Sequence, residues 1–280
     1  MRRNFLCLLA SAAVLSLASC TTTKFVPDGS YLLDEVKIRT DQKNIRPSSL
    51  RMYVRQNPNA KWFSLIKTQL YVYNLSGRDS TKWGNKFLRR IGDAPVIYSE
   101  DEAKRSEEEI TKAVHNMGYM AATVKRSTKI KKKKIKLYYD VTAGKPYVVQ
   151  SIKYDIYDPK IASLLKQDSA RSLLKEGMYL DVNVLDADRQ RITNKLLRNG
   201  YYKFNKDYIG YTADTVRNTY NVDLTQHLQM YKAHASDSAR AHQQYWINKI
   251  NFITDYDVLQ SSASVSYTHL RAHETTLHLV

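Results

Sequence analysis

The sequence predicts an α+β protein built from two tandem β-α-α-β-β units, each a three-stranded sheet with two helices on one face. A strand-like segment at residues 147–154 recurs, with the same apolar positions, 98 residues later at 245–252. Two helix-like segments each end in a glycine followed by a tyrosine, at Gly118-Tyr119 and Gly200-Tyr201. Self-similarity at a fixed period is typical of repeated domains.

The unit between the two recurring segments is complete in the sequence. It opens with the strand at 147–154 and continues with a short helix through 161–174. A second helix, at 185–198, has leucine and isoleucine at helical spacing. Asn199-Gly200 then favours a helix end, because glycine adopts the left-handed conformation of a C-terminal cap. Strands through 204–209 and 218–231 are expected to close the unit.

The preceding unit follows the same order. A strand starts at Val36 and Ile38, and Pro47 opens a first helix. A second helix is expected from Ser106, where Ser106 to Glu109 fits a capping box, and it ends at Gly118. Strands at 121–127 and 135–141 follow, joined by a lysine-rich turn within 129–136. The first unit also has an insertion at about 59–90.

These patterns divide the chain as follows: a signal peptide at 1–19, a linker at 20–30, a first domain at 31–145, a second at 146–231, a linker at 232–244, the first strand of a third domain at 245–258, and a foreign tail at 261–280.

The N-terminus resembles the export signal of a bacterial lipoprotein. Arg2 and Arg3 precede an apolar stretch at 5–17, which is shorter than the roughly 20 residues needed to span a bilayer as a helix. It ends in Leu17-Ala18-Ser19-Cys20, which resembles a lipobox. Ordinary signal cleavage near Ala18 is the alternative.

Cysteine usage favours the lipoprotein. The other cysteine, Cys7, lies in the segment that cleavage removes, so the mature chain would keep Cys20 alone. Exported proteins meet oxidising conditions in which cysteines usually pair. A single thiol at the new N-terminus is better explained by lipid than by a disulfide.

The charge balance indicates acidic partners. The chain has 44 Lys and Arg against 27 Asp and Glu, a formal net charge of +17. An exported lipoprotein rarely meets nucleic acid, so anionic lipid headgroups or acidic polypeptides are the expected partners. The lysine run at 129–136 is interpreted first as a solvated hairpin turn.

The last residues differ in character from the rest. Residues 265–280 resemble a translated adapter sequence, so we expect a gene truncated near residue 258. His269, His273 and Glu274 have a spacing that suggests metal ligands, but no expected element or further ligand supports a site there.

The repeated unit resembles a POTRA domain, because a glycine-aromatic pair follows its second helix. Further motifs resemble the BamA/TamA family, and among its members the lipidated TamA-like proteins of Bacteroidetes. The residues that carry this resemblance are Gln56, Asn57, Pro58, Gly92, Pro95, Gly118, Tyr119, Gly200, Tyr201 and Tyr202. It covers about residues 24–258 and only the POTRA region, and it places the family's barrel after this chain.

The resemblance implies a periplasmic region that binds polypeptides and is anchored to the outer membrane through lipid on Cys20. The implied partners are unfolded outer-membrane protein precursors, outer-membrane lipid and other envelope assembly proteins. Extended segments would add to an exposed sheet edge through main-chain hydrogen bonds. The turn residues Gly118, Tyr119, Gly200 and Tyr201 would be structural.

An enzyme and an envelope scaffold or lipid-handling lipoprotein are the two other classes of function. The sequence has no G-x-S-x-G, H-E-x-x-H or Walker motif and no paired cysteines, so no catalytic residue, cofactor or metal is expected. The acidic residues Asp93, Glu100, Asp101 and Glu102 are interpreted as a helix start. An envelope scaffold or lipid-handling lipoprotein that uses a basic surface is the alternative function, favoured if the lysines gather on one face.

The lipid anchor is testable by substitution of Cys20. Cys20→Ala should leave the chain without acyl groups and release it from membranes, because the lipid is the anchor that the sequence predicts. Membrane fractionation and mass spectrometry of the N-terminal peptide measure this. Unchanged membrane retention together with an unmodified wild-type peptide would refute the prediction.

Overall fold

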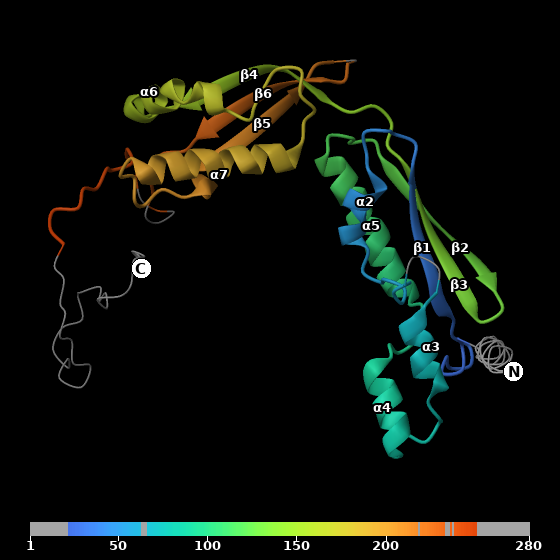
Figure 1. The fold of residues 1–280 in the computed structure, drawn as a ribbon. Coiled ribbons are helices and arrows are strands. Elements are labelled where there is room, and N and C mark those ends of the chain that lie inside the picture. The colour runs from blue at the N-terminus through green and yellow to red at the C-terminus, as the bar shows by residue number, and fades with distance from the viewer. Residues whose placement is uncertain (1–21, 63–65, 218, 233–235, 237, 251–280) are drawn as a thin grey trace, which may run out of the picture.

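The structure, a computed structural model, describes residues 22–62, 66–217, 219–232, 236 and 238–250. They form two successive α+β units, each with its own three-stranded sheet (Figure 1). The predicted signal peptide, Cys20 and the C-terminal tail lie outside the described residues.

The first unit contains β1 (Leu32–Thr40), α2 (Pro47–Leu50), the 3-10 turn η1 (Arg51–Tyr53), α3 (Thr68–Leu75), α4 (Trp83–Ile91), α5 (Glu100–Asn116), β2 (Thr123–Lys131) and β3 (Lys134–Thr142). The second contains β4 (Val148–Ile156), α6 (Pro159–Gln167), η2 (Ser169–Arg171), α7 (Val182–Arg198), η3 (Lys206–Tyr208), β5 (Ile209–Thr215) and β6 (Asn221–Leu228). The insertion of the first unit thus supplies most of the helical hairpin α3–α4.

Both sheets have the same topology. The strand orders are β1-β3-β2 and β4-β6-β5, so the last strand of each unit lies in the centre. It runs parallel to the first strand and antiparallel to the second. Each opening strand has an irregularity at the same place, between Leu33 and Glu35 in β1 and between Val149 and Ser151 in β4. The α+β fold with two three-stranded sheets is confirmed.

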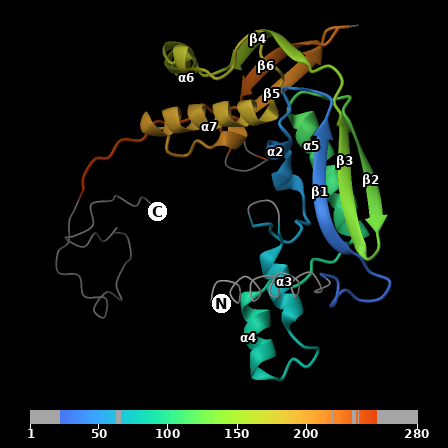
Figure 2. The same cartoon turned by 45° about the vertical axis from the view of Figure 1, so that its right-hand side comes forward.

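Alternation of buried and exposed side chains along the central strands shows which face of each sheet is buried. In β3, Ile135, Leu137, Tyr139 and Val141 face the core, and in β6 the buried residues are Val222, Leu224, Gln226 and Leu228. The long helices α5 and α7 lie along that side of the sheets (Figure 2). They contribute Ile110 and Val114 to one core and Ile192 and Leu196 to the other, as the helical spacing predicts.

The start of α5 differs from the expected one. The helix begins at Glu100, and its N-cap is Ser99, whose side chain accepts a hydrogen bond from the Glu102 amide. Ser99 to Glu102 repeats the capping-box pattern about two turns before Ser106. Ser106 instead lies inside the helix, fully buried, where its hydroxyl donates to the Glu102 carbonyl oxygen and accepts from the Arg55 amide.

Smaller differences occur where aromatic residues suggested strands. The strand expected through residues 204–209 begins only at Ile209, because η3 precedes it. The lysine-rich turn is a tight β2–β3 hairpin with Lys132 at φ 56°. Tyr245 to Ile250 is not a strand, and the remainder of the segment expected to open a third domain lies outside the described residues.

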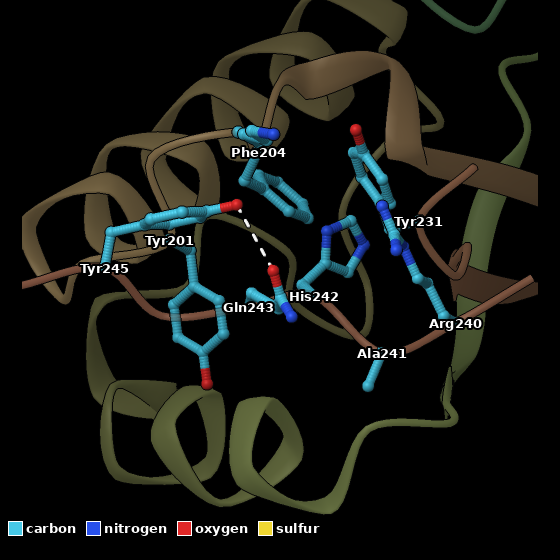
Figure 3. A pocket seen from close by; sticks show the side chains of 9 residues that line it. Tyr201, Phe204, Tyr231, Arg240, Ala241, His242, Gln243 and Tyr245 are labelled. Atoms are coloured by element: carbon cyan, nitrogen blue, oxygen red, sulfur yellow. Dashed lines mark hydrogen bonds between the residues drawn. The ribbon is translucent and has the colours of Figure 1, made fainter. Parts of the chain in front are cut away.

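Part of the expected linker at 232–244 contacts the second unit. The ring of His242 lies 4.9 Å from that of Phe204 (Figure 3). It also lies 4.7 Å from the ring of Tyr208, and its Nε2 is 2.9 Å from the Gln229 carbonyl oxygen. The cavity beside these rings holds only about 10 Å³, roughly the room of one water probe. This is a packed contact with no room for a ligand.

Each glycine after a long helix joins one unit to the segment that follows it. Gly118 and Gly200 have φ of 93° and 85°, the left-handed conformation that side chains disfavour. The Tyr147 amide donates to the Gly118 carbonyl at 2.9 Å, and the Tyr245 amide donates to the Gly200 carbonyl at 2.7 Å. The 98-residue repeat in the sequence is therefore also a repeat of this joint.

Neighbouring backbone leaves little room for a side chain at either joint. A Cβ on Gly118 would lie 3.1 Å from the Leu180 carbonyl oxygen, and one on Gly200 would lie 2.8 Å from that of Tyr245. The following residues, Tyr119 and Tyr201, are both buried. We propose that these four residues have structural roles.

Valine at either joint should therefore destabilise the protein. Gly118→Val and Gly200→Val are each expected to lower the free energy of unfolding by about 1–2 kcal/mol through backbone strain, measured by chemical denaturation. Gly210→Val in β5 is the control, because Gly210 has no positive φ and a Cβ there meets nothing within 4 Å. Equal stability of all three variants would contradict the prediction.

Candidate polypeptide-binding edges

Two amide side chains of the 56–59 motif hold the segment before α5. Gln56 Nε2 donates to the Ser99 carbonyl at 2.5 Å, and Gln56 Oε1 accepts from the Ser99 amide at 3.0 Å. Asn59 Nδ2 donates to the Ala94 carbonyl at 2.7 Å, and its Oδ1 accepts from the Val96 amide at 3.1 Å. Both side chains are buried and imitate the pairing of a neighbouring strand.

The segment held in this way covers the start of β1. The Leu33 amide donates to the Val96 carbonyl at 2.8 Å, and the Tyr98 amide donates to the Tyr31 carbonyl at 2.9 Å. Leu32 and Ile97 form an antiparallel bridge. The outer edge of β1 is therefore occupied where the strand begins.

The other motif residues belong to the same region. A Cβ on Gly92 would lie 2.5 Å from the Tyr73 amide nitrogen, so a glycine lets the chain pass close to α3. Pro58 and Pro95 are half-buried, whereas Asn57 is exposed. The motif brings together two segments more than thirty residues apart, which agrees with a structural role for Gln56, Gly92 and Pro95.

Lys67 covers the next part of β1. Its Nζ donates to the Asp34 carbonyl at 2.6 Å and lies 3.1 Å from Asp34 Oδ1, while the side chain is only 8% exposed. Burial lowers the pKa of Lys67, and the Asp34 carboxylate opposes that shift. Sequence reasoning missed this residue, because no local pattern connects a lysine in the insertion with a strand 33 residues earlier.

The opening strand of the second unit is covered only at its start. The Val149 amide donates to the Met178 carbonyl, and the Gly177 amide donates to the Val149 carbonyl, both at 2.8 Å. Within the described residues, no backbone hydrogen bond from another segment reaches the outer side of β4 from Ser151 to Ile156. Tyr154 and Tyr157 beside this stretch are 56% and 73% exposed.

The second strands, β2 and β5, are the other sheet edges. In the described part of the chain their strand pairing is with β3 and β6 alone. Lys125, Lys129 and Lys131 lie along β2, and lysines on an edge discourage pairing with another chain. Since β5 is short and bears Asp214 near its end, the uncovered stretch of β4 is the edge best suited to an apolar polypeptide.

Basic side chains gather on the outer face of the first sheet. By the strand register this face carries Lys37, Arg39, Lys125, Lys129, Lys131, Lys134 and Lys136, with Glu35 and Asp140 as its acidic residues. Lys136 pairs with Glu35 at 2.9 Å, and Arg39 lies 3.5 Å from Asp140. The remaining lysines leave an excess of positive charge. The same face of the second sheet instead carries Asp155, Asp214 and Asp223, with Lys153 as its basic residue.

The acidic residues near α5 form part of the helix start. Glu100, Asp101 and Glu102 occupy its first turn, where the helix dipole favours carboxylates. Arg126 pairs with Glu100 and with Glu107. Burial, reinforced by a hydrogen bond to Glu100, raises the pKa of Tyr98 to about 12.

Among the described residues, no group of three His, Cys, Asp or Glu is arranged to hold a metal ion. No helix among them is both long enough and apolar enough to cross a membrane.

Comparison with known proteins gives a family for the first unit. The family described as POTRA, surface antigen variable number repeat, matches residues 31–144. No curated protein matches the chain.

Two of the solved structures that the chain matches are of BamA and of Omp85. BamA from Haemophilus ducreyi lacking POTRA domains 1–3 is 19% identical, with a TM-score of 0.35 over 70% of this chain. POTRA1-2 of the periplasmic domain of Omp85 from Anabaena is 15% identical, with a TM-score of 0.33 over 72% of this chain and 98% of its own. The chain spans only 29% of the length of the Haemophilus ducreyi protein.

The family match covers the whole of the first sheet with its helices, and the second unit repeats the same strand order. Residues 31–144 are therefore a POTRA domain, and the second unit has the same fold.

Proposed function

We propose that this chain is the periplasmic, polypeptide-binding region of an outer-membrane assembly or translocation factor. It would receive unfolded outer-membrane proteins by β-strand addition and pass them to a C-terminal barrel, together with other envelope assembly proteins. POTRA domains belong to proteins of this class, which supports the general assignment. The observation that carries the specific proposal is the uncovered edge of β4.

The opening strand of each unit is covered only at its start. Among the described residues, the 94–99 segment and Lys67 cover β1 as far as Asp34, and the 177–180 segment covers β4 as far as Val149. Unpaired amides and carbonyls on an edge attract any extended chain, because main-chain pairing does not depend on sequence. A factor that handles many precursors requires such sequence independence.

Strand addition predicts a specific response to proline. The mature chain should bind extended peptides of alternating apolar residues with Kd on the order of 1 μM to 1 mM, since a short pairing must offset the entropy of association. Proline at a peptide position whose amide bonds to β4 should abolish binding, because proline has no amide donor. Isothermal titration calorimetry measures this.

The matched control peptide has proline at the neighbouring position, whose amide points away from β4, and it should keep most of the affinity. If both proline peptides bind equally and binding disappears at high salt, attraction to the basic surface explains the binding and strand addition is wrong.

A second candidate function is binding to an anionic membrane surface. It is supported by the end of the first domain at which β1 begins. Lys24 Nζ donates to the Ser76 carbonyl at 2.6 Å, and the Phe25 ring contacts the Tyr73 ring at 5.4 Å. Lys24 and Phe25 are therefore packed against α3. The carbonyl of Thr22, the first described residue, accepts from Asn74 Nδ2.

The same end presents apolar and basic side chains together. On α4, Trp83, Phe87 and Ile91 are spaced four residues apart and are 82%, 52% and 49% exposed. Lys82, Lys86 and Arg90 on this helix are also exposed. An aromatic stripe with flanking cations is typical of helices that lie in a membrane interface.

The lysine hairpin belongs to this end too. Lys133 pairs with Asp28 at 2.6 Å, and its carbonyl accepts from the Leu32 amide at 2.9 Å. The β2–β3 turn is thus tied to the segment that follows the proposed anchor. We infer that lipid on Cys20 would bring α4 and the hairpin to an anionic membrane surface.

Vesicle flotation of the mature chain, starting at residue 20 with Cys20→Ser, tests this second function. It should float with vesicles that contain phosphatidylglycerol but not with pure phosphatidylcholine. Replacing Lys131, Lys132 and Lys133 with Gln should weaken binding by about tenfold or more, at up to about 1 kcal/mol per lysine. Trp83→Ser with Phe87→Ser should weaken it as well.

Trp246→Ser is the control, because Trp246 is 80% exposed but lies after the second unit. Equal flotation of all variants, or equal binding to both kinds of vesicle, would contradict the proposed membrane surface.

A further inference from the structure

The two units differ at one buried position of the central strand. In the first unit Ile38 of β1 pairs with Tyr139 of β3, and in the second Tyr154 of β4 pairs with Gln226 of β6. Both pairs lie at the same distance from the irregularity in the opening strand. Tyr139 and Gln226 are therefore equivalent residues of the repeat.

Tyr139 fills its position completely. Its side chain is 0% exposed, and its hydroxyl donates to the Ala103 carbonyl of α5 at 3.0 Å. The first domain thus places an aromatic ring and one hydrogen-bonding hydroxyl between its sheet and its long helix.

Gln226 leaves the corresponding space open. It is 1% exposed, yet within the described structure neither Nε2 nor Oε1 has a hydrogen-bond partner. A cavity of about 380 Å³ lies beside it, with Ile156, Leu165 and Ile192 among its apolar walls and with Tyr154 and Lys166 also lining it. The volume is within the range of roughly 300–1,000 Å³ that ligand pockets occupy.

A buried carboxamide without partners is costly. Leaving such a group unsatisfied typically costs about 1–3 kcal/mol, so a leucine would serve the fold better. Gln226 therefore suits a cavity whose occupant brings a hydrogen-bonding group with it. A phenolic hydroxyl can accept from Nε2 or donate to Oε1.

The cavity lies next to the uncovered edge of β4. Tyr154 and Ile156 belong to both, since they line the cavity and lie in the stretch of β4 whose outer side has no backbone partner among the described residues. Alternate side chains of a strand added to this edge would point to the helix side of the sheet, where the cavity is. Pockets for alternate side chains give strand addition its selectivity.

We propose that this cavity receives a tyrosine side chain from the polypeptide that adds to β4. The ring would contact Ile156, Leu165 and Ile192, and the hydroxyl would bond to Gln226, as Tyr139 fills the first domain from within. The inference rests on the proposed function and adds to it a preferred residue at one position of the bound segment.

A small-molecule probe tests the cavity without any peptide. Thermal shift and NMR titration of the mature chain with p-cresol and with toluene should show p-cresol binding more tightly, by about fivefold for one hydrogen bond. Gln226→Leu should remove that preference. Gln226→Tyr, which copies the first domain, should abolish binding of both, and Thr225→Val on the opposite face of β6 should change neither.

Peptides then test the occupant. Alternating apolar peptides with Tyr, Phe or Ala at the position facing the cavity should bind in that order of affinity, and Gln226→Leu should make Tyr and Phe equal. Proline-sensitive binding with no preference for Tyr overturns the inference but leaves strand addition standing. Absence of any peptide binding overturns the proposed function and this inference with it.

If Gln226→Tyr does not fold, the Gln226→Leu comparison decides alone. Failure of p-cresol to bind the wild-type chain, or an unchanged preference in Gln226→Leu, shows that the cavity holds ordered water only and overturns the inference.

Discussion

Each domain depends on its last strand. β3 and β6 lie in the centre of their sheets and pair with the first strand of their unit, more than seventy residues earlier in the second unit, as well as with the strand just before. Until that strand is in place, the opening strand has no partner within its sheet and the helices have only part of a face to cover. The alternate buried residues of each central strand then join the sheet to the long helix.

This topology leaves two edges per sheet, and in both domains another segment covers the start of the first edge. In the POTRA domain at 31–144, the 94–99 segment and the buried Lys67 cover β1 as far as Asp34. In the second unit, residues 177–180 cover only the beginning of β4. The two repeats of the fold differ in charge, because the outer face of the first sheet carries mainly lysines and that of the second carries mainly aspartates.

Each glycine joint connects a unit to the segment that follows it. The Gly118 carbonyl accepts from the Tyr147 amide, and the Gly200 carbonyl accepts from the Tyr245 amide. The same hydrogen bond therefore holds the following segment at the end of the long helix in both units. The ring of Tyr179 contacts that of Tyr119 at 6.2 Å, and its hydroxyl accepts from Asn44. Contacts of this kind fix where the second domain begins relative to the first.

The sequence by itself determined the repeat, the order of elements and the core positions, because alternation, helical spacing and glycine caps are local signals. Ile110, Val114, Ile192 and Leu196 could be placed in the cores for that reason. The Ser106 cap was wrong because two capping-box patterns lie close together in the sequence, and only burial of Ser106 against Arg55 separates them. Only the tertiary structure decided which edge is uncovered and where a cavity remains. Lys67 on β1, and Gln226 where its repeat has Tyr139, depend on partners distant in the chain, and no local pattern records such contacts.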